Sequence, residues 1–194
     1  QTYDAYLALP PAGTGPGILL FQEIFGVNDH IQGVAEQYAQ DGFVVLAPDL
    51  FWRQQARVAL GYDGEDRNQA VSMMKALVPE EMQADIRSSL AALRSRPETT
   101  GRKSGALGYC LGGRLAYTAA AITDVDAAVA FYGGGIHGSA VESVRSAVSD
   151  KNAEVLVYEG ANHGFNCWDR GTYHPNSAAL GHGRALTFLA QHLF

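Results

Sequence analysis

The sequence predicts an α/β fold in which helices cover both faces of a mainly parallel central sheet. Short apolar runs at residues 17–21, 105–109 and 127–132 contain few polar residues, which is typical of strands buried on both faces. Longer stretches with helical periodicity lie between such runs, as the crossover connections of parallel strands require. With 194 residues, 47% of them hydrophobic, the chain is expected to form a single domain over residues 1–194.

The individual elements follow in order along the chain. Residues 3–9 alternate well enough for an edge strand. Asn28 or Asp29 is a suitable N-cap for a helix whose apolar face begins at Ile31, and Gly42 supplies its left-handed stop. The other predicted strands are 17–21, 43–47, 105–109, 127–132 and 154–158, and the other predicted helices are 80–93, 111–122, 139–150 and one at the C-terminus.

Charge and hydropathy narrow the partners to small molecules. A net charge of -6 disfavours nucleic acids and anionic membranes, which attract basic patches. No apolar run reaches the roughly 18 residues of a membrane helix, and the first residues lack the layout of a signal peptide. We therefore expect a soluble cytoplasmic protein. The chain begins at Gln1 without Met, so the alternative that a leader has been removed stays open. The oligomeric state is not encoded in any pattern we identify.

Cys110 is the candidate nucleophile. It lies within Gly108-Tyr109-Cys110-Leu111-Gly112-Gly113, which matches the nucleophile elbow G-x-S-x-G with Cys in place of Ser. The glycines allow close backbone approach where a strand turns sharply into a helix, and the helix N-terminus favours the thiolate. The alternative is that Cys110 is a small buried core residue, as free cysteines often are.

His163 is the candidate base. It follows the predicted strand 154–158, and the order of nucleophile first and His last is that of the α/β-hydrolase fold. In that position His163 would relay the proton of the nucleophile and return it to the leaving group. The remaining histidines are expected to be incidental: His30, His137, His174, His182 and His192.

The loop after the first buried strand is expected to form half of an oxyanion hole. The backbone N–H of Ile24, together with that of Leu111, would point at the developing oxyanion. Glu23 stands next to this site, where a carboxylate would repel an oxyanion. Its presence suggests that Glu23 has another role.

Four segments in the right order resemble the dienelactone hydrolase family, also called carboxymethylenebutenolidases: residues 22–27, 47–50, 108–113 and 160–165. The resemblance covers nearly the whole chain. It implies an α/β-hydrolase fold and hydrolysis of an activated enol lactone through an acyl-cysteine intermediate, with no metal or cofactor. It also implies that Glu23 keeps the resting thiol protonated and takes its proton when substrate binds. By analogy alone, the family points to degradation of aromatic compounds.

The sequence departs from the family where the acid that orients His163 should lie. Between Gly138 and Ser139, roughly two dozen residues that would form a strand and an Asp-bearing loop are missing from the pattern. Either the gene has lost them or the natural chain carries them here. We favour the second, because a lost central strand leaves a gap in the sheet. Three carboxylates are nominal substitutes, and each also fits an ordinary surface position: Glu142, Asp150 and Glu159.

The substrate side departs as well. Relatives acting on dienelactone hold the substrate carboxylate with arginines, and Arg67 matches one of them. The second would follow His163 by a few residues, where this chain has Asn166-Cys167. Whether Arg170 or Cys167 contributes to the site stays open. The leading hypothesis is a lactone or enol-ester hydrolase. The alternatives are a broader carboxylesterase with the same residues, or a non-catalytic binding protein that has lost the acid.

Overall fold

The computed structural model describes residues 2–133, 144–146, 149 and 153–194. Its five-stranded sheet has the order β1-β3-β2-β4-β5. The strands are β1 (Ala5–Ala8), β2 (Gly17–Phe21), β3 (Val44–Pro48), β4 (Ser104–Tyr109) and β5 (Ala127–Phe131). Strand β1 runs antiparallel to β3 at one edge, and the other pairs are parallel. The mainly parallel sheet and the N-terminal edge strand are therefore as predicted, and the antiparallel direction of that strand is a finding of the structure.

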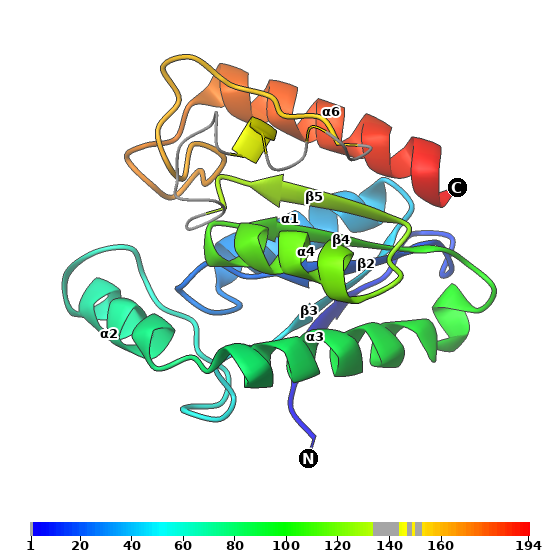
Figure 1. Cartoon of the computed structure of the whole chain (residues 1–194), viewed down its shortest axis with the longest axis horizontal. Helices are drawn as coiled ribbons and strands as arrows, with labels where there is room; N and C mark the ends of the chain where they lie inside the picture. Colours follow the sequence, from blue (N-terminus) through cyan, green and yellow to red (C-terminus); the bar gives the residue numbers. More distant parts are fainter. Residues whose placement is uncertain (1, 134–143, 147–148, 150–152) are drawn as a thin grey trace.

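Helices cover both faces of the sheet (Figure 1). They are α1 (Asp29–Gln40), α2 (Gly64–Lys75), α3 (Pro79–Arg94), α4 (Leu111–Ile122) and α6 (Pro175–Leu193). Helices α1 and α6 share one buried apolar cluster with the sheet, while α3 and α4 share the cluster on its other face. This two-sided burial explains why β2, β3 and β4 read as continuous apolar runs. Within the described ranges, no helix is long and apolar enough to cross a membrane.

The predicted helix caps are present. Asn28 is the N-cap of α1 and its side-chain oxygen accepts a hydrogen bond from the N–H of Ile31 at 3.3 Å. Gly42 follows the same helix with a φ of 105°, in the left-handed region that favours glycine. Helix α2 was not predicted, because its sequence has a weak apolar face and only Ala70 and Met73 are buried.

Residues 154–158 were predicted to be a strand, and this prediction is wrong for the described structure. The segment forms neither a strand nor a helix, and Leu156 and Val157 are 39% and 50% exposed. An apolar run becomes a strand only where a neighbour accepts its backbone hydrogen bonds. Among the described residues, β5 is the last strand of the sheet, so the expected intervening strand is not there to pair with it. The predicted helix at 139–150 lies outside the described residues except at 144–146, which are helical, and at 149.

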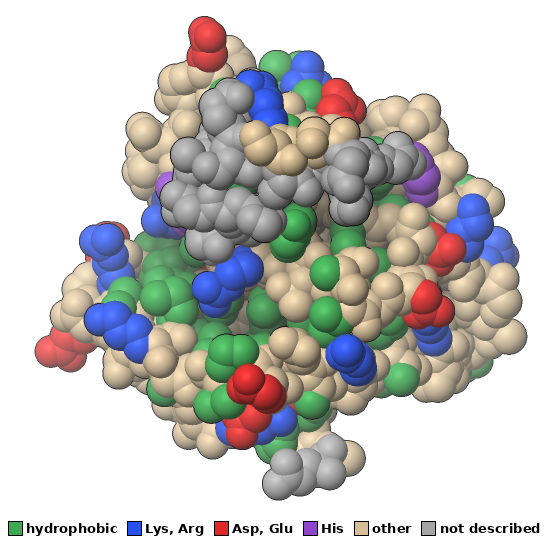
Figure 2. Space-filling view, viewed as in Figure 1, with side chains coloured by type: hydrophobic (Ala, Val, Ile, Leu, Met, Phe, Trp, Pro, Cys, Tyr) green, Lys and Arg blue, Asp and Glu red, His purple; other side chains and the backbone are tan. Residues whose placement is uncertain are grey.

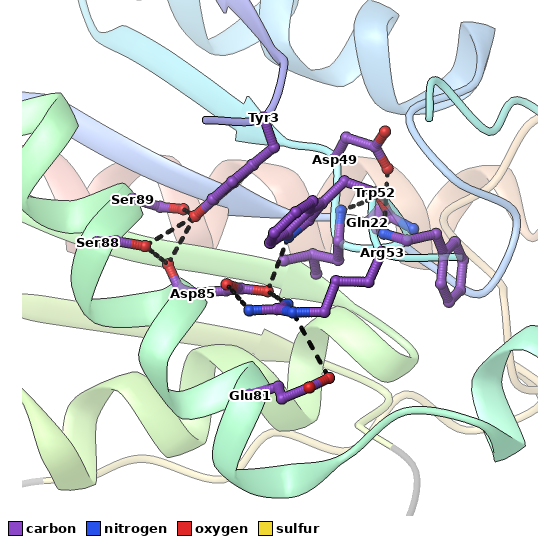
Figure 3. A network of polar contacts seen from close by, with 11 residues as sticks. Tyr3, Gln22, Asp49, Trp52, Arg53, Glu81, Asp85, Ser88 and Ser89 are labelled. Atoms are coloured by element: carbon purple, nitrogen blue, oxygen red, sulfur yellow. Dashed lines mark hydrogen bonds and ion pairs between the residues drawn. The ribbon is translucent and has the colours of Figure 1, made fainter. Parts of the chain in front are cut away.

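A network of polar and aromatic contacts fixes the loop after β3 (Figure 3). Asp85 on α3 is buried, and its carboxylate accepts hydrogen bonds from the side chains of Trp52 and Arg53. Tyr3 stacks on Trp52 with ring centroids 5.1 Å apart. The N–H of Leu50 in turn donates to the side-chain oxygen of Gln22, directly before Glu23. The network thus ties the N-terminal arm and α3 to the two loops that follow β2 and β3.

Backbone contacts of glycines hold the turn from β4 into α4. A Cβ atom on Gly108 would lie 2.0 Å from the carbonyl oxygen of Gly112. A Cβ atom on Gly112 would lie 2.1 Å from the carbonyl oxygen of Phe21, at the end of β2. Real Cβ atoms do not approach backbone this closely, so the turn keeps its shape only with glycine at both positions.

We expect Gly112→Ala to lower the free energy of unfolding by more than about 2 kcal/mol, since the methyl group meets backbone that cannot retreat. Gly183→Ala is the matched control: it lies in α6, is exposed, and has nothing within 4 Å of an added Cβ. Alanine loses less backbone entropy than glycine when the helix forms, so Gly183→Ala should raise the free energy of unfolding by about 0.5–1 kcal/mol. Urea unfolding monitored by circular dichroism measures both, and equal midpoints for Gly112→Ala and wild type would contradict the packing argument.

Candidate active site

Cys110 occupies the strained turn at the N-terminus of α4. Its φ of 57° and ψ of -114° lie in a region that residues with a Cβ rarely adopt. The N–H of Cys110 donates to the carbonyl oxygen of Phe131 at 3.0 Å, which ties the turn to the end of β5. The side chain is partly exposed, and the N–H of Leu111 hydrogen-bonds its sulfur. This is the geometry of an elbow that presents a nucleophile.

The thiol of Cys110 is protonated at rest. Burial and the nearby Glu23 carboxylate raise the pKa of Cys110 to about 11, against the opposing effects of the Leu111 N–H, Arg170 and Arg114. The helix N-terminus thus favours the thiolate as expected, but burial and the adjacent negative charge outweigh it. At neutral pH the thiol is therefore held in its protonated, unreactive form.

Glu23 is a buried carboxyl group with one charged partner. It is 1% exposed, and burial raises its pKa to about 7, while Arg170 and Tyr132 lower it. The Nη1 atom of Arg170 lies 3.4 Å from Oε1 of Glu23. The second oxygen, Oε2, has no hydrogen-bond partner among the described residues. Glu23 therefore titrates in the physiological range, which suits a group that takes up a proton.

Arg170 reaches this carboxylate from the segment that follows His163. Its guanidinium lies against Gly164, where a Cβ atom would be 2.5 Å from Nη1, and Gly164 has a φ of +83°. It also lies 5.8 Å from the ring centroid of Phe25 and 5.7 Å from that of Tyr62. The sequence left the place of Arg170 open, and the structure puts it beside Glu23.

His163 is exposed on a turn and rests against Tyr132. The two rings meet edge to face with centroids 5.0 Å apart. Desolvation and the charge of Arg170 lower the pKa of His163, so its imidazole is neutral at pH 7 and can accept a proton. In the part of the chain that the structure describes, no hydrogen bond joins His163 to Cys110 or to a carboxylate. Tyr132 holds an unusual backbone, with a φ of 36°. Its buried hydroxyl is close enough to Glu23 to lower the pKa of that carboxyl group, but it does not meet the geometry of a hydrogen bond.

The remaining predicted residues lie as follows. Ile24 is partly buried in the turn after β2, and Leu111 opens α4, where its N–H precedes the helical hydrogen-bond pattern. Arg67 is exposed on α2, with no described side-chain contact to Cys110, His163 or Glu23. Glu159 is exposed, and Glu142 and Asp150 lie outside the described residues. Figure 2 shows hydrophobic side chains gathered at the side of the molecule where Figure 1 places α2 and the start of α4, with basic side chains beside them.

A second cluster was missed by sequence reasoning. Glu23, His30 and Cys167 are all buried, and one ligand atom of each lies within 4.8 Å of the others. It is the one group of metal-ligating side chains found in the described ranges. His30 was expected to be incidental, but it is fully buried in the first turn of α1. Its place at the start of a helix, beside the loop that carries Glu23, is the signal that would have identified it.

Comparison with known proteins gives a consistent family. The model of the dienelactone hydrolase family matches residues 3–150 and, in a second segment, 135–193. A carboxymethylenebutenolidase of Pseudomonas putida is 31% identical, over 98% of this chain and 92% of its own length. The carboxymethylenebutenolidase of Pseudomonas sp. strain P51 is 39% identical, over 69% of this chain and 56% of its own length.

A solved structure from Klebsiella pneumoniae, provisionally named a dienelactone hydrolase, has a TM-score of 0.79 and 27% sequence identity. The match covers 96% of this chain and 92% of the other. The alignment with the Pseudomonas putida enzyme spans 217 residues, more than the 194 of this chain. That relative therefore carries additional residues within the aligned region.

We expect alkylation of Cys110 by iodoacetamide to be slow at pH 7 and to accelerate steadily from pH 8 to 10, because the thiol titrates only near pH 11. Glu23→Gln removes a negative charge that raises this pKa, so the variant should alkylate faster than wild type above pH 7, where Glu23 is ionised. Peptide mass spectrometry reports Cys110 separately from the buried Cys167.

The matched control is Glu36→Gln, which removes an exposed carboxylate that hydrogen-bonds Tyr6. It should leave the alkylation rate of Cys110 unchanged. If the rate levels off below pH 9, or if Glu23→Gln slows the alkylation, the electrostatic description of the resting thiol is wrong.

Proposed function

The chain belongs to the dienelactone hydrolase family, and from this premise we propose that it hydrolyses small lactones or enol esters through an acyl-cysteine intermediate on Cys110. It is a carboxylic-ester hydrolase with the α/β-hydrolase fold. The observation that carries the proposal is the buried Glu23 carboxyl group beside the Cys110 thiol, with a pKa near 7 where the thiol has one near 11. Such a pair keeps the nucleophile protonated until the balance between the two groups changes.

Arg170 supplies the means for that change. Its charge lowers the pKa of Glu23, and a substrate carboxylate that pairs with Arg170 would weaken this effect. Glu23 then becomes a stronger base in a site from which the substrate has displaced water. It takes the proton from Sγ of Cys110, and the thiolate attacks the carbonyl carbon of the ester.

The amides of Ile24 and Leu111 would stabilise the oxyanion that forms on the carbonyl oxygen. When the C–O bond of the ester breaks, the leaving enolate takes the proton that Glu23 accepted from Cys110. A water molecule then attacks the thioester carbonyl carbon with His163 as its base, the C–S bond breaks, and the protonated His163 gives its proton to the departing sulfur. Release of the acid returns Cys110 to its thiol form. The support for His163 is its neutral imidazole beside Tyr132 and its place after the nucleophile in the chain.

We propose that the acid that orients His163 is not among the 194 residues of this sequence, and that the natural protein carries it on an additional strand and loop between Gly138 and Ser139. Two findings support this position: the family match breaks into two segments that overlap at residues 135–150, and the Pseudomonas putida relative has additional residues. The exposed Leu156 and Val157 would gain a neighbour from such a strand. We place the enzyme in the reducing cytoplasm, where a free thiol nucleophile persists.

Cys110→Ala should abolish hydrolysis of both a carboxylate-bearing lactone and a neutral aryl acetate, because it removes the sulfur that forms the proposed acyl intermediate. Cys167→Ala is the matched control and should retain turnover, since Cys167 is fully buried away from solvent. Steady-state kinetics measure hydrolysis, and the mass of a trapped acyl-enzyme measures formation of the acyl intermediate. Full activity in Cys110→Ala would refute the mechanism, because hydrolysis would then proceed without this cysteine.

Arg67→Ala should lower kcat/KM for the anionic lactone about 10- to 100-fold and leave the neutral aryl acetate unaffected, because one charge-assisted hydrogen bond to the substrate is worth about 1.5–3 kcal/mol. Arg57→Ala serves as control, since Arg57 is an exposed arginine paired with Asp4. An equal effect of Arg67→Ala on both substrates would favour the broader carboxylesterase.

A further inference from the structure

We propose that Glu23, His30 and Cys167 form a binding site for a thiophilic divalent cation of the Zn²⁺ class, distinct from the nucleophile. The inhibitory consequence of this site rests on the proposed function, because Glu23 is the group that would activate Cys110. The binding itself does not depend on catalysis.

The geometry supports the site. A carboxylate oxygen, an imidazole nitrogen and a thiol sulfur lie within 4.8 Å of one another, and all three residues are buried. This mixed oxygen, nitrogen and sulfur set is one that Zn²⁺ accepts. Ligand atoms around a tetrahedral zinc ion are separated by about 3.5 Å, so small side-chain rotations close the remaining gap. Three protein ligands leave a fourth position for water or another anion.

The side chains have unused ligand capacity. Both nitrogens of His30 are buried and have no hydrogen-bond partner among the described residues. The same holds for Oε2 of Glu23. Buried polar atoms are normally paired, and several unpaired ones that converge on one point call for an occupant. A metal ion would satisfy the imidazole and the carboxylate together.

Charge decides which occupant fits. Cys167 loses its proton to solvent when its sulfur binds the metal, and with the Glu23 carboxylate it contributes two negative charges that neutralise a divalent cation. Arg170, which lies 3.4 Å from Oε1 of Glu23, adds a positive charge that competes with the cation. The site is therefore selective for a cation that gains from a thiolate bond, and it disfavours Mg²⁺ or Ca²⁺, which prefer oxygen ligands.

Occupation of the site has a direct chemical consequence. A carboxylate bound to a metal ion no longer accepts the proton of Cys110, so the resting thiol stays protonated when substrate arrives. The cation thereby inhibits hydrolysis without touching the nucleophile.

The test uses Co²⁺ as a spectroscopic probe in Cys110→Ala, which removes the competing thiol. We expect a thiolate-to-cobalt charge-transfer band in the near ultraviolet and visible bands of a four-coordinate ion. Cys167→Ser in the same background should abolish the charge-transfer band. His30→Gln removes a direct ligand, so it should weaken cobalt binding by at least the roughly 10- to 100-fold that loss of an outer-shell partner costs. Arg170→Gln should tighten binding by removing the competing charge.

His182→Gln is the matched control, because His182 is a partly buried histidine that pairs with Asp41 outside the cluster. It should leave the cobalt spectrum unchanged. Circular dichroism verifies that each variant is folded, and if Cys167→Ser is not, His30→Gln carries the comparison. Absence of a thiolate band in Cys110→Ala would overturn the proposal, as would a band that persists in folded Cys167→Ser or His30→Gln.

Inhibition is measured separately in the protein with Cys110 intact. Zn²⁺ should inhibit hydrolysis reversibly, with recovery on chelation, and Cys167→Ser should be at least about tenfold less sensitive. Metal binding without inhibition would leave the metal site standing and refute the role of Glu23 in catalysis. Equal sensitivity of wild type and Cys167→Ser would place the inhibitory ion at Cys110 and overturn the proposed inhibition.

Discussion

Burial of the Glu23 carboxyl group beside a thiol is the constraint to which the rest of the site responds. A carboxylate removed from water must be paired with a cation or protonated. Glu23 has Arg170 at 3.4 Å as its charged partner, and its pKa near 7 means that it is also partly protonated at neutral pH. The same charge keeps Cys110 protonated. Arg170 in turn lowers the pKa of His163, so four groups share one electrostatic balance. A change at Arg170 therefore shifts the pKa of Glu23, Cys110 and His163, and a change at Glu23 shifts that of Cys110.

The sheet was predictable because burial on both faces leaves an unambiguous apolar pattern. Strands β2 to β5 and helices α1, α3 and α4 lie within a few residues of their predicted bounds. The elbow was predictable for a similar reason, since Gly108 and Gly112 are required by backbone contacts that no other residue tolerates. Local chemistry and local geometry agree at these positions.

The contacts around Glu23 were not predictable from the sequence. Arg170 and Cys167 reach Glu23 through a turn whose shape depends on Gly164 and on packing against Phe25 and Tyr62. Nothing in their spacing from His163 specifies which of the two faces the carboxylate. The segment 154–158 failed in the opposite way: its composition suits a strand, but pairing depends on a neighbour, which is a tertiary property. The apolar periodicity of a sequence indicates which face of a segment is buried, but it does not identify the segment that pairs with it.

The turn at Cys110 is fastened on two sides, by the approach of Gly112 to Phe21 in β2 and by the hydrogen bond from Cys110 to Phe131 in β5. His163, in contrast, is carried by an exposed turn without described sheet pairing. In the proposed mechanism, the attacking atom therefore belongs to the rigid frame of the molecule, and the proton carrier belongs to an exposed turn. In a lineage built this way, new substrates are accommodated by remodelling the loop that bears the histidine, while the bond-forming sulfur stays in the same place.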